Sequence, residues 1–162
     1  MHPQHTHQVS VAASEVPPRK KASNFPEPFA SRMQGRIVRP LGEYFRLHNF
    51  GANLVTLAPG AVSAPRHSHS RQDEFVYVLA GEAMLVTIAG EMQLRAGMCT
   101  GFPAGTGNAH QLVNQAGTDC VYLVIGDRSV GDTVDFPDDD LIALTNPDGT
   151  RRFARKDGTL YA

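Results

Sequence analysis

A group of side chains in the middle of the chain has the types and the spacing of a metal site. His67 and His69 lie two residues apart, and Glu74 follows five residues after the second histidine. Residues i and i+2 of a β-strand point to the same face, so the two imidazoles would lie side by side. His110 begins a second alternating run. Three imidazole nitrogens and one carboxylate suit a first-row divalent ion and leave coordination positions open for water or substrate.

Two motifs surround these candidate ligands. The first consists of Gly60, His67-Ser68-His69, Glu74 and Gly81, and the second consists of Gly97, Pro103-Ala104-Gly105, His110 and Asn114. Together they resemble the two motifs of the cupin family. The resemblance implies a double-stranded β-helix, the cupin jelly-roll barrel, with one divalent metal ion (Zn, Mn, Fe or Ni) held inside it. It also implies a homodimer, and it carries the ligand roles onto His67, His69, Glu74 and His110.

Two spacings in the chain are longer than the family pattern. Six residues separate Gly60 from His67, and four separate Gly105 from His110. The second difference lengthens the turn that delivers the third histidine. The spacing between His110 and Asn114 is kept, so we retain His110 as a ligand.

Short β-like runs divided by glycine-containing turns position these motifs. The runs cover residues 36–40, 53–58, 74–79, 82–88, 91–94, 98–102, 109–114 and 120–125. Ala-Gly pairs mark many of their ends, because glycine accepts a positive φ without a steric cost. Long helical periods are absent. The pattern predicts an all-β domain, an antiparallel sandwich or barrel.

The chain divides into three predicted parts. Residues 1–35 are poor in periodic hydrophobic residues and predict a disordered start, which includes His2, His5 and His7, and an N-terminal arm. Residues 36–126 form the predicted barrel. Residues 127–162 form an acidic segment and a C-terminal hairpin extension, with a turn over residues 146–149. The acidic segment faces either the basic run RRFARK, in one chain or across a dimer, or solvent.

Side chains near the candidate ligands extend the predicted site. If Glu74 faces inward, Val76 and Val78 form an apolar floor, and the side chains between them face another sheet or a subunit. Candidates for contact with a substrate are Phe102, Met84 and Arg66. Core packing is the alternative for the first two, and a solvated surface charge is the alternative for the third.

Composition excludes several classes of protein. A formal net charge of -1 argues against a protein that coats nucleic acid or an anionic membrane. No apolar run approaches the roughly 18–20 residues of a membrane span, and the first residues lack the order of a secretory signal, so we predict a cytoplasmic protein. Cys99 and Cys120 are too few for a disulfide framework and are predicted to be reduced core residues.

Three functions are compatible with these patterns. The first is a metal-dependent enzyme acting on a small polar molecule, by isomerase or lyase chemistry of the Lewis-acid type or as an Fe-dependent dioxygenase. The second is a non-catalytic metal-binding or small-molecule-binding regulatory cupin. The third is a barrel that the ion only stabilises. A full ligand set with open positions favours the enzyme, with a small-molecule ligand and without nucleic-acid or membrane partners.

Overall fold

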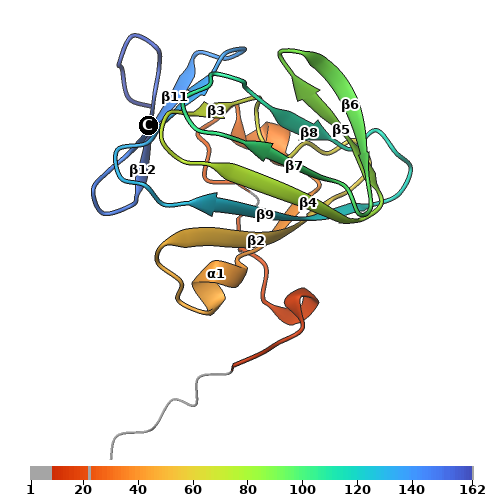
Figure 1. Cartoon of the computed structure of the whole chain (residues 1–162). Helices are drawn as coiled ribbons and strands as arrows, with labels where there is room; N and C mark the ends of the chain where they lie inside the picture. Colours follow the sequence, from red (N-terminus) through yellow and green to blue (C-terminus); the bar gives the residue numbers. More distant parts are fainter. Residues whose placement is uncertain (1–8, 22, 162) are drawn as a thin grey trace, which may run out of the picture.

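The computed structural model describes residues 9–21 and 23–161, and its regular secondary structure is almost entirely β-strand (Figure 1). The strands are β1 (Arg36–Arg39), β2 (Phe50–Leu57), β3 (Ser68–His69), β4 (Glu74–Ala80), β5 (Glu82–Thr87), β6 (Gly90–Arg95), β7 (Cys99–Phe102), β8 (Gln111–Val113), β9 (Cys120–Asp127), β10 (Thr133–Phe136), β11 (Leu141–Thr145) and β12 (Arg151–Ala154). The helical segments are η1 (Ala13–Glu15), η2 (Ala30–Met33) and α1 (Leu41–Tyr44). No helix in the described ranges is long and apolar enough to span a membrane. The predicted histidine-rich start lies outside the described residues.

The strands form antiparallel sheets in which neighbours in space are often distant in sequence. One sheet has the order β1-β2-β9-β4-β7, a second has the order β12-β11-β10-β3, and a third has the order β6-β5-β8. β2 pairs with β9 over its whole length, and β9 pairs with β4 on its other side. Such long-range antiparallel pairing is typical of a jelly roll. The structure therefore confirms the all-β jelly-roll fold that the sequence predicted.

Alternation along β4 shows how the barrel interior is built. Val76 and Val78 are 2% and 0% exposed and belong to the main hydrophobic core, whereas Phe75, Tyr77 and Leu79 remain exposed on the other side of the strand. The two faces of a strand alternate with period two, so the same alternation turns Glu74 inward. The apolar core thus begins directly below this carboxylate.

The N-terminal arm packs against the C-terminal strands beside the barrel. Phe25 of the N-terminal arm packs against Phe136 of β10 and Phe153 of β12, with ring centroids 5.7 Å and 5.3 Å apart. β10 pairs in turn with β3, which carries His69. The segment after residue 126 is therefore part of the wall around the candidate ligands. Neither β3 nor β10 was predicted, because β3 is two residues long and β10 lies in a polar, aspartate-rich stretch.

The acidic segment forms ion pairs within its own chain. Asp140 contacts Arg155 at 3.3 Å and also accepts a hydrogen bond from the backbone N–H of Lys156. The neighbouring Asp139 contacts Arg32 at 2.7 Å. Of the alternatives that the sequence left open, the structure shows contact with the basic run in one chain. The Asp140 contacts join the segments that flank the C-terminal hairpin, and the Asp139 pair connects the acidic segment to the N-terminal arm.

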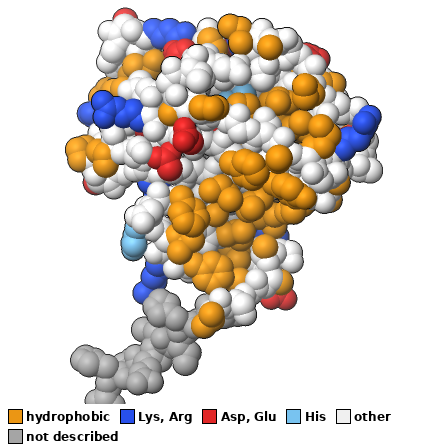
Figure 2. Space-filling view, viewed as in Figure 1, with side chains coloured by type: hydrophobic (Ala, Val, Ile, Leu, Met, Phe, Trp, Pro, Cys, Tyr) orange, Lys and Arg blue, Asp and Glu red, His pale blue; other side chains and the backbone are white. Residues whose placement is uncertain are grey.

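The outer face of the five-stranded sheet is apolar and exposed. Figure 2 shows hydrophobic side chains gathered over β2, β9 and α1. Exposed members of this sheet face are Ile37, Phe50, Phe75, Tyr77 and Leu79. Cys99 pairs with Tyr77 across β4 and β7 and is exposed as well, because paired residues share one face of a sheet. The prediction of a core position was therefore wrong for Cys99, whereas Cys120 is buried as predicted.

A glycine is required at the turn between β4 and β5. Gly81 has a φ of +69°, a conformation that favours glycine. A Cβ atom at this position would overlap the carbonyl oxygen of Asp119. The turn therefore packs directly against the backbone that leads into β9.

Candidate metal centre

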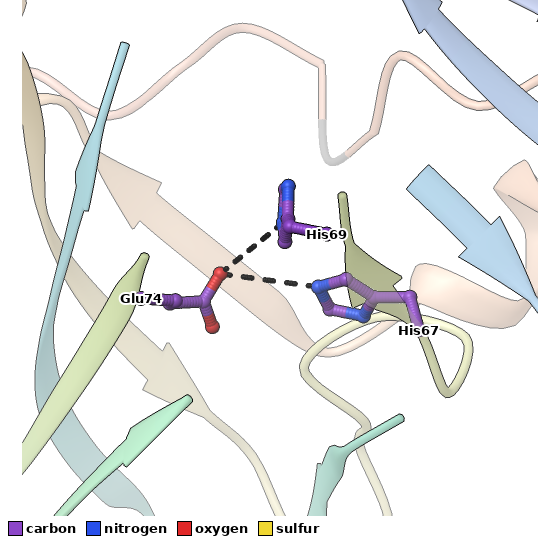
Figure 3. Close-up of side chains that lie close together, drawn as sticks. All are labelled: His67, His69 and Glu74. Atoms are coloured by element: carbon purple, nitrogen blue, oxygen red, sulfur yellow. Dashed lines mark ion pairs between the residues drawn. The ribbon is translucent and has the colours of Figure 1, made fainter. Parts of the chain in front are cut away.

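His67, His69 and Glu74 converge inside the barrel (Figure 3). Their ligand atoms all lie within 4.8 Å of one another. Glu74 Oε2 is 3.9 Å from Nε2 of His67 and 3.7 Å from Nε2 of His69. Glu74 is the first residue of β4 and His69 the last of β3, so two sheets supply the cluster.

His110 reaches the same carboxylate from the neighbouring segment. Its Nε2 lies 3.0 Å from Glu74 Oε1. His110 and His67 form an isolated β-bridge in which each backbone N–H donates to the other residue's carbonyl, at 2.8 Å and 3.1 Å. This bridge holds His110 beside His67 whatever the length of the turn that precedes it. The structure thus brings the four predicted ligands together.

Hydrogen bonds to Nδ1 fix the orientation of two of the imidazoles. Nδ1 of His67 lies 2.9 Å from the carbonyl oxygen of Pro65, and Nδ1 of His69 lies 2.7 Å from Oδ2 of Asp132. A carbonyl and a carboxylate only accept hydrogen bonds, so Nδ1 must carry the proton in both rings. A neutral imidazole has one N–H, and Nε2 then presents its lone pair to the cluster.

These lone pairs make the cluster suitable for a cation. Burial lowers the pKa of His69, although Asp132 opposes this shift, so the ring is neutral near neutral pH. Two nitrogen lone pairs and a carboxylate oxygen then face one another across less than 4 Å, an arrangement that repels unless a positive charge lies between them. Imidazole nitrogen and carboxylate oxygen are the donors that Zn, Mn, Fe and Ni accept. The residues present therefore fit a divalent metal ion.

Glu74 supplies a permanent negative charge. Burial alone would raise the pKa of this carboxyl group, but the hydrogen bond from His110 and the nearby imidazole of His67 bring its pKa well below the usual range. The group is therefore ionised near neutral pH. An anionic ligand of this kind stabilises a bound cation more strongly than a neutral oxygen would.

His110 is held by packing where the other two histidines are held by hydrogen bonds. Its Nδ1 is buried and has no hydrogen-bond partner among the described residues. The ring of Phe102 stacks on the imidazole ring of His110, with ring centroids 3.5 Å apart and ring planes 3° from parallel. Phe102 therefore fixes the orientation of a ligand ring from behind.

Asp132 is a functional residue that the sequence did not reveal. It is 1% exposed, and besides His69 it accepts hydrogen bonds from the backbone N–H groups of Arg71 and Gln72, at 2.9 Å and 3.3 Å. Carboxylates that receive the outer N–H of a metal-binding histidine orient the ring and raise its basicity. The signal was present: Asp132 alternates with the buried Val134 and Phe136, which places it on the inner face.

The cluster opens into a cavity of about 950 Å³. Val76, Tyr122 and Val124 form its apolar floor. Its rim includes Phe25 of the N-terminal arm and residues 148–151 of the turn between β11 and β12. The C-terminal hairpin therefore lines the cavity of its own chain.

The three predicted substrate contacts lie around the cavity and none is part of its lining. Phe102 lies behind His110, and Met84 is half-buried on β5. Arg66 donates two hydrogen bonds of 2.7 Å, from Nε and Nη2, to the carboxylate of Asp138. Contact of these residues with a substrate stays a prediction.

Comparison with known proteins identifies the family. The cupin domain family matches residues 53–126. A Silicibacter pomeroyi protein named as a sugar phosphate isomerase from a cupin superfamily is 37% identical, with 94% of this chain and 96% of that chain covered and a TM-score of 0.87. The chain belongs to the cupin superfamily. A search of proteins with curated functions found no match.

Other cupins are similar over shorter or more divergent stretches. An Acidithiobacillus ferrooxidans protein, provisionally named a sugar phosphate isomerase, is 27% identical over 88% of this cupin and 97% of its own length, with a TM-score of 0.69. The polyketide cyclase RemF of Streptomyces resistomycificus is 21% identical over 73% of this cupin and 78% of its own chain, with a TM-score of 0.59. The likeness to RemF, at 21% identity, shows the fold alone. The Silicibacter likeness extends beyond residues 53–126 and so includes the terminal segments.

Proposed function

We propose that this cupin is a metal-dependent enzyme that acts on a small polar molecule by Lewis-acid chemistry of the isomerase or lyase type. The convergence of the His67 and His69 lone pairs on the ionised Glu74, at the wall of a large cavity, carries this proposal. The names of the Silicibacter and Acidithiobacillus proteins support the isomerase class.

The residues around the cluster divide the work of such a reaction. His67, His69, Glu74 and His110 would hold the ion, which when bound would polarise a carbonyl or hydroxyl oxygen of the substrate. Val76 and Val124 exclude water below it and lower the local dielectric, which strengthens electrostatic interactions in the cavity.

Tyr122 is a polar group on the otherwise apolar floor. It is 3% exposed, and burial raises the pKa of its phenol, although the charge of Arg36 opposes this shift. The hydroxyl therefore keeps its proton at neutral pH. A protonated phenol in this position would donate a hydrogen bond to a substrate oxygen in the cavity.

Metal content and turnover, measured together, test the proposal. The double variant His67→Ala/His69→Ala is compared with His48→Ala, which removes an exposed histidine far from the cluster in sequence. We expect wild type and His48→Ala to hold about one metal ion per chain after purification without added metal, and the double variant to hold none. Isomerisation of small aldoses, ketoses and their phosphates should follow the metal content.

Three outcomes contradict the proposal in different ways. Metal retained by the double variant would show that the cluster is not the site. Metal bound at the cluster without turnover of any substrate would favour a binding or structural role. Oxygen consumption by the Fe(II)-loaded protein, without isomerisation, would favour a dioxygenase.

A further inference from the structure

A positive charge from the first strand lies inside the cavity. Arg36 is the first residue of β1, and its guanidinium lines the cavity beside Tyr122. Nη1 donates a hydrogen bond to the carbonyl oxygen of Ser63, which fixes the direction of the side chain. Burial lowers the pKa of Arg36, but a guanidinium stays protonated at neutral pH. The cavity wall therefore carries a fixed cation in addition to the candidate metal centre.

A second guanidinium reaches the same cavity from the other end of the chain. Arg151 is the first residue of β12, and its Nη2 donates a 3.3 Å hydrogen bond to Oε1 of Gln72. Gln72 is 8% exposed and is itself held by a 2.9 Å hydrogen bond from Nε2 to the carbonyl oxygen of Ser129. Within residues 9–21 and 23–161, Arg151 forms no ion pair. Its head group is thus positioned by a neutral partner and keeps donors for a ligand.

The carboxylates of the cavity wall are engaged elsewhere. Asp73 accepts a hydrogen bond from the backbone N–H of Ala104, and Asp148 accepts hydrogen bonds from Thr150 in its own turn. Their lone pairs satisfy loop backbone and hydroxyl groups. They stabilise loops at the rim and do not neutralise Arg151.

Two further carboxylates of the lining also have local partners. Asp127 accepts hydrogen bonds from the backbone N–H groups of Asp73 and Ser129. Glu43 pairs with Arg19 at 2.5 Å, and both members of that pair are exposed. Arg19 thus has its own carboxylate partner near the solvent.

Arg36 and Arg151 both line this cavity. Burial lowers the pKa of each, the charge of Arg19 adds to both shifts, and the charges of Asp132 and Glu74 oppose the shift of Arg151. Like charges held close together raise the free energy of the folded protein, and an anion between them removes that repulsion. Guanidinium groups bind phosphate and carboxylate oxygens in a paired geometry.

We infer that Arg36 and Arg151 form an oxyanion-binding subsite, which selects substrates that carry a phosphate or carboxylate group. The substrate's anionic end would bind these two side chains, while its reacting oxygen faces His67, His69 and Glu74. The inference rests on the proposed function for the reaction, but anion binding itself does not require a metal. Both arginines lie outside residues 53–126, the region that the cupin domain family matches, so an edge strand of the barrel and the C-terminal hairpin would supply this selectivity.

Binding of inorganic phosphate to the full chain, measured by calorimetry, tests the subsite. Acetate is titrated in parallel, and the tighter of the two anions identifies the group that the subsite takes. We expect saturable binding to wild type and at least a tenfold weaker affinity in Arg151→Ala. Arg152→Ala is the matched control, because Arg152 is the next residue of the same strand and, although both side chains are partly open to solvent, only Arg151 lines this cavity. Its affinity should equal that of wild type.

Two further variants separate this inference from the metal site. Arg36→Gln should weaken anion binding as Arg151→Ala does. His67→Ala/His69→Ala should still bind phosphate even if it has lost the metal. Equal affinity in wild type and Arg151→Ala, equal losses in Arg151→Ala and Arg152→Ala, or the absence of saturable binding of either anion to wild type would overturn the subsite. If only His67→Ala/His69→Ala loses phosphate binding, the arginine subsite is overturned as well, because the anion would then bind to the metal ion.

Discussion

Replacement of Asp132 by asparagine tests the electrostatic design of the metal centre with a nearly isosteric change. In the wild type, one carboxylate oxygen accepts from the backbone N–H groups of Arg71 and Gln72, and the other accepts from Nδ1 of His69. An amide has only one oxygen. If that oxygen serves the two backbone donors, the amide N–H₂ faces His69, and two donors then oppose each other.

The imidazole has two responses, and both weaken metal binding. It can move its proton to Nε2, which removes the lone pair from the cluster, or it can keep the tautomer and lose its orienting hydrogen bond. Hydrogen bonds to charged acceptors contribute about 1.5–3 kcal/mol, against about 0.5–1.5 kcal/mol for neutral pairs. Loss of such an orienting partner typically lowers metal affinity about 10–100-fold. We expect Asp132→Asn to bind Zn²⁺ about 10–100-fold more weakly than wild type, which is a difference of about 1.4–2.7 kcal/mol in binding free energy.

Competition against a chromogenic chelator near neutral pH measures this affinity, and circular dichroism checks that the variant is folded. The control is Asp135→Asn, which makes the same chemical change at an exposed position of β10, three residues further along the chain. The reasoning fails if folded Asp132→Asn binds Zn²⁺ as tightly as wild type. It fails equally if Asp135→Asn loses as much affinity, since the effect would then reflect the net charge of the segment.

Three other predictions concern the scaffold. Gly81→Ala should lower the free energy of unfolding by several kcal/mol, because its Cβ would overlap the backbone of Asp119. Gly60→Ala has open space at a similar φ and should lose only the roughly 1–2 kcal/mol that the left-handed conformation costs. Urea titration compares the two variants, and equal losses would contradict the overlap. The exposed apolar sheet face should be covered by a second copy, so light scattering should report a dimer for wild type and a monomer for Tyr77→Glu; a wild-type monomer would refute this. Burial raises the pKa of Cys120 to about 11, so a thiol reagent at mildly alkaline pH should label Cys99 alone in the native protein and both cysteines in denaturant; two labelled native thiols would contradict the assignment.

The sequence predicted the parts of this protein that depend on local spacing. His67, His69 and Glu74 are close in the chain, and the alternation of a strand is enough to place them on one wall. The jelly-roll fold followed from short runs and glycine turns for the same reason. The isolated β-bridge between His67 and His110 places His110 at the cluster, although the turn before His110 is longer than in the family pattern.

What escaped prediction depends on contacts between the ends of the chain. Asp132, Arg36 and Arg151 are ordinary charged residues in sequence, and each becomes part of the cavity only when distant strands pair. β10 reaches β3 across more than sixty residues, and β12 is placed by its pairing with β11. No local period encodes such pairings, because they depend on packing between segments that are distant in sequence, such as that of Phe25 with Phe136 and Phe153.

For the proposed enzyme, the arrangement of the cavity wall would make catalysis and recognition separable during evolution. The histidines and Glu74 stand inside the barrel, next to the hydrophobic core to which Val76 belongs. The hairpin that carries Arg151 joins the rest of its sheet through the pairing of β11 with β10, and residues 147–150 form an exposed turn beside the cavity. Exchange of that turn and its first strand residue would alter which molecules enter while leaving the reactive wall untouched. A family built in this way could diversify its substrates by recombining chain termini.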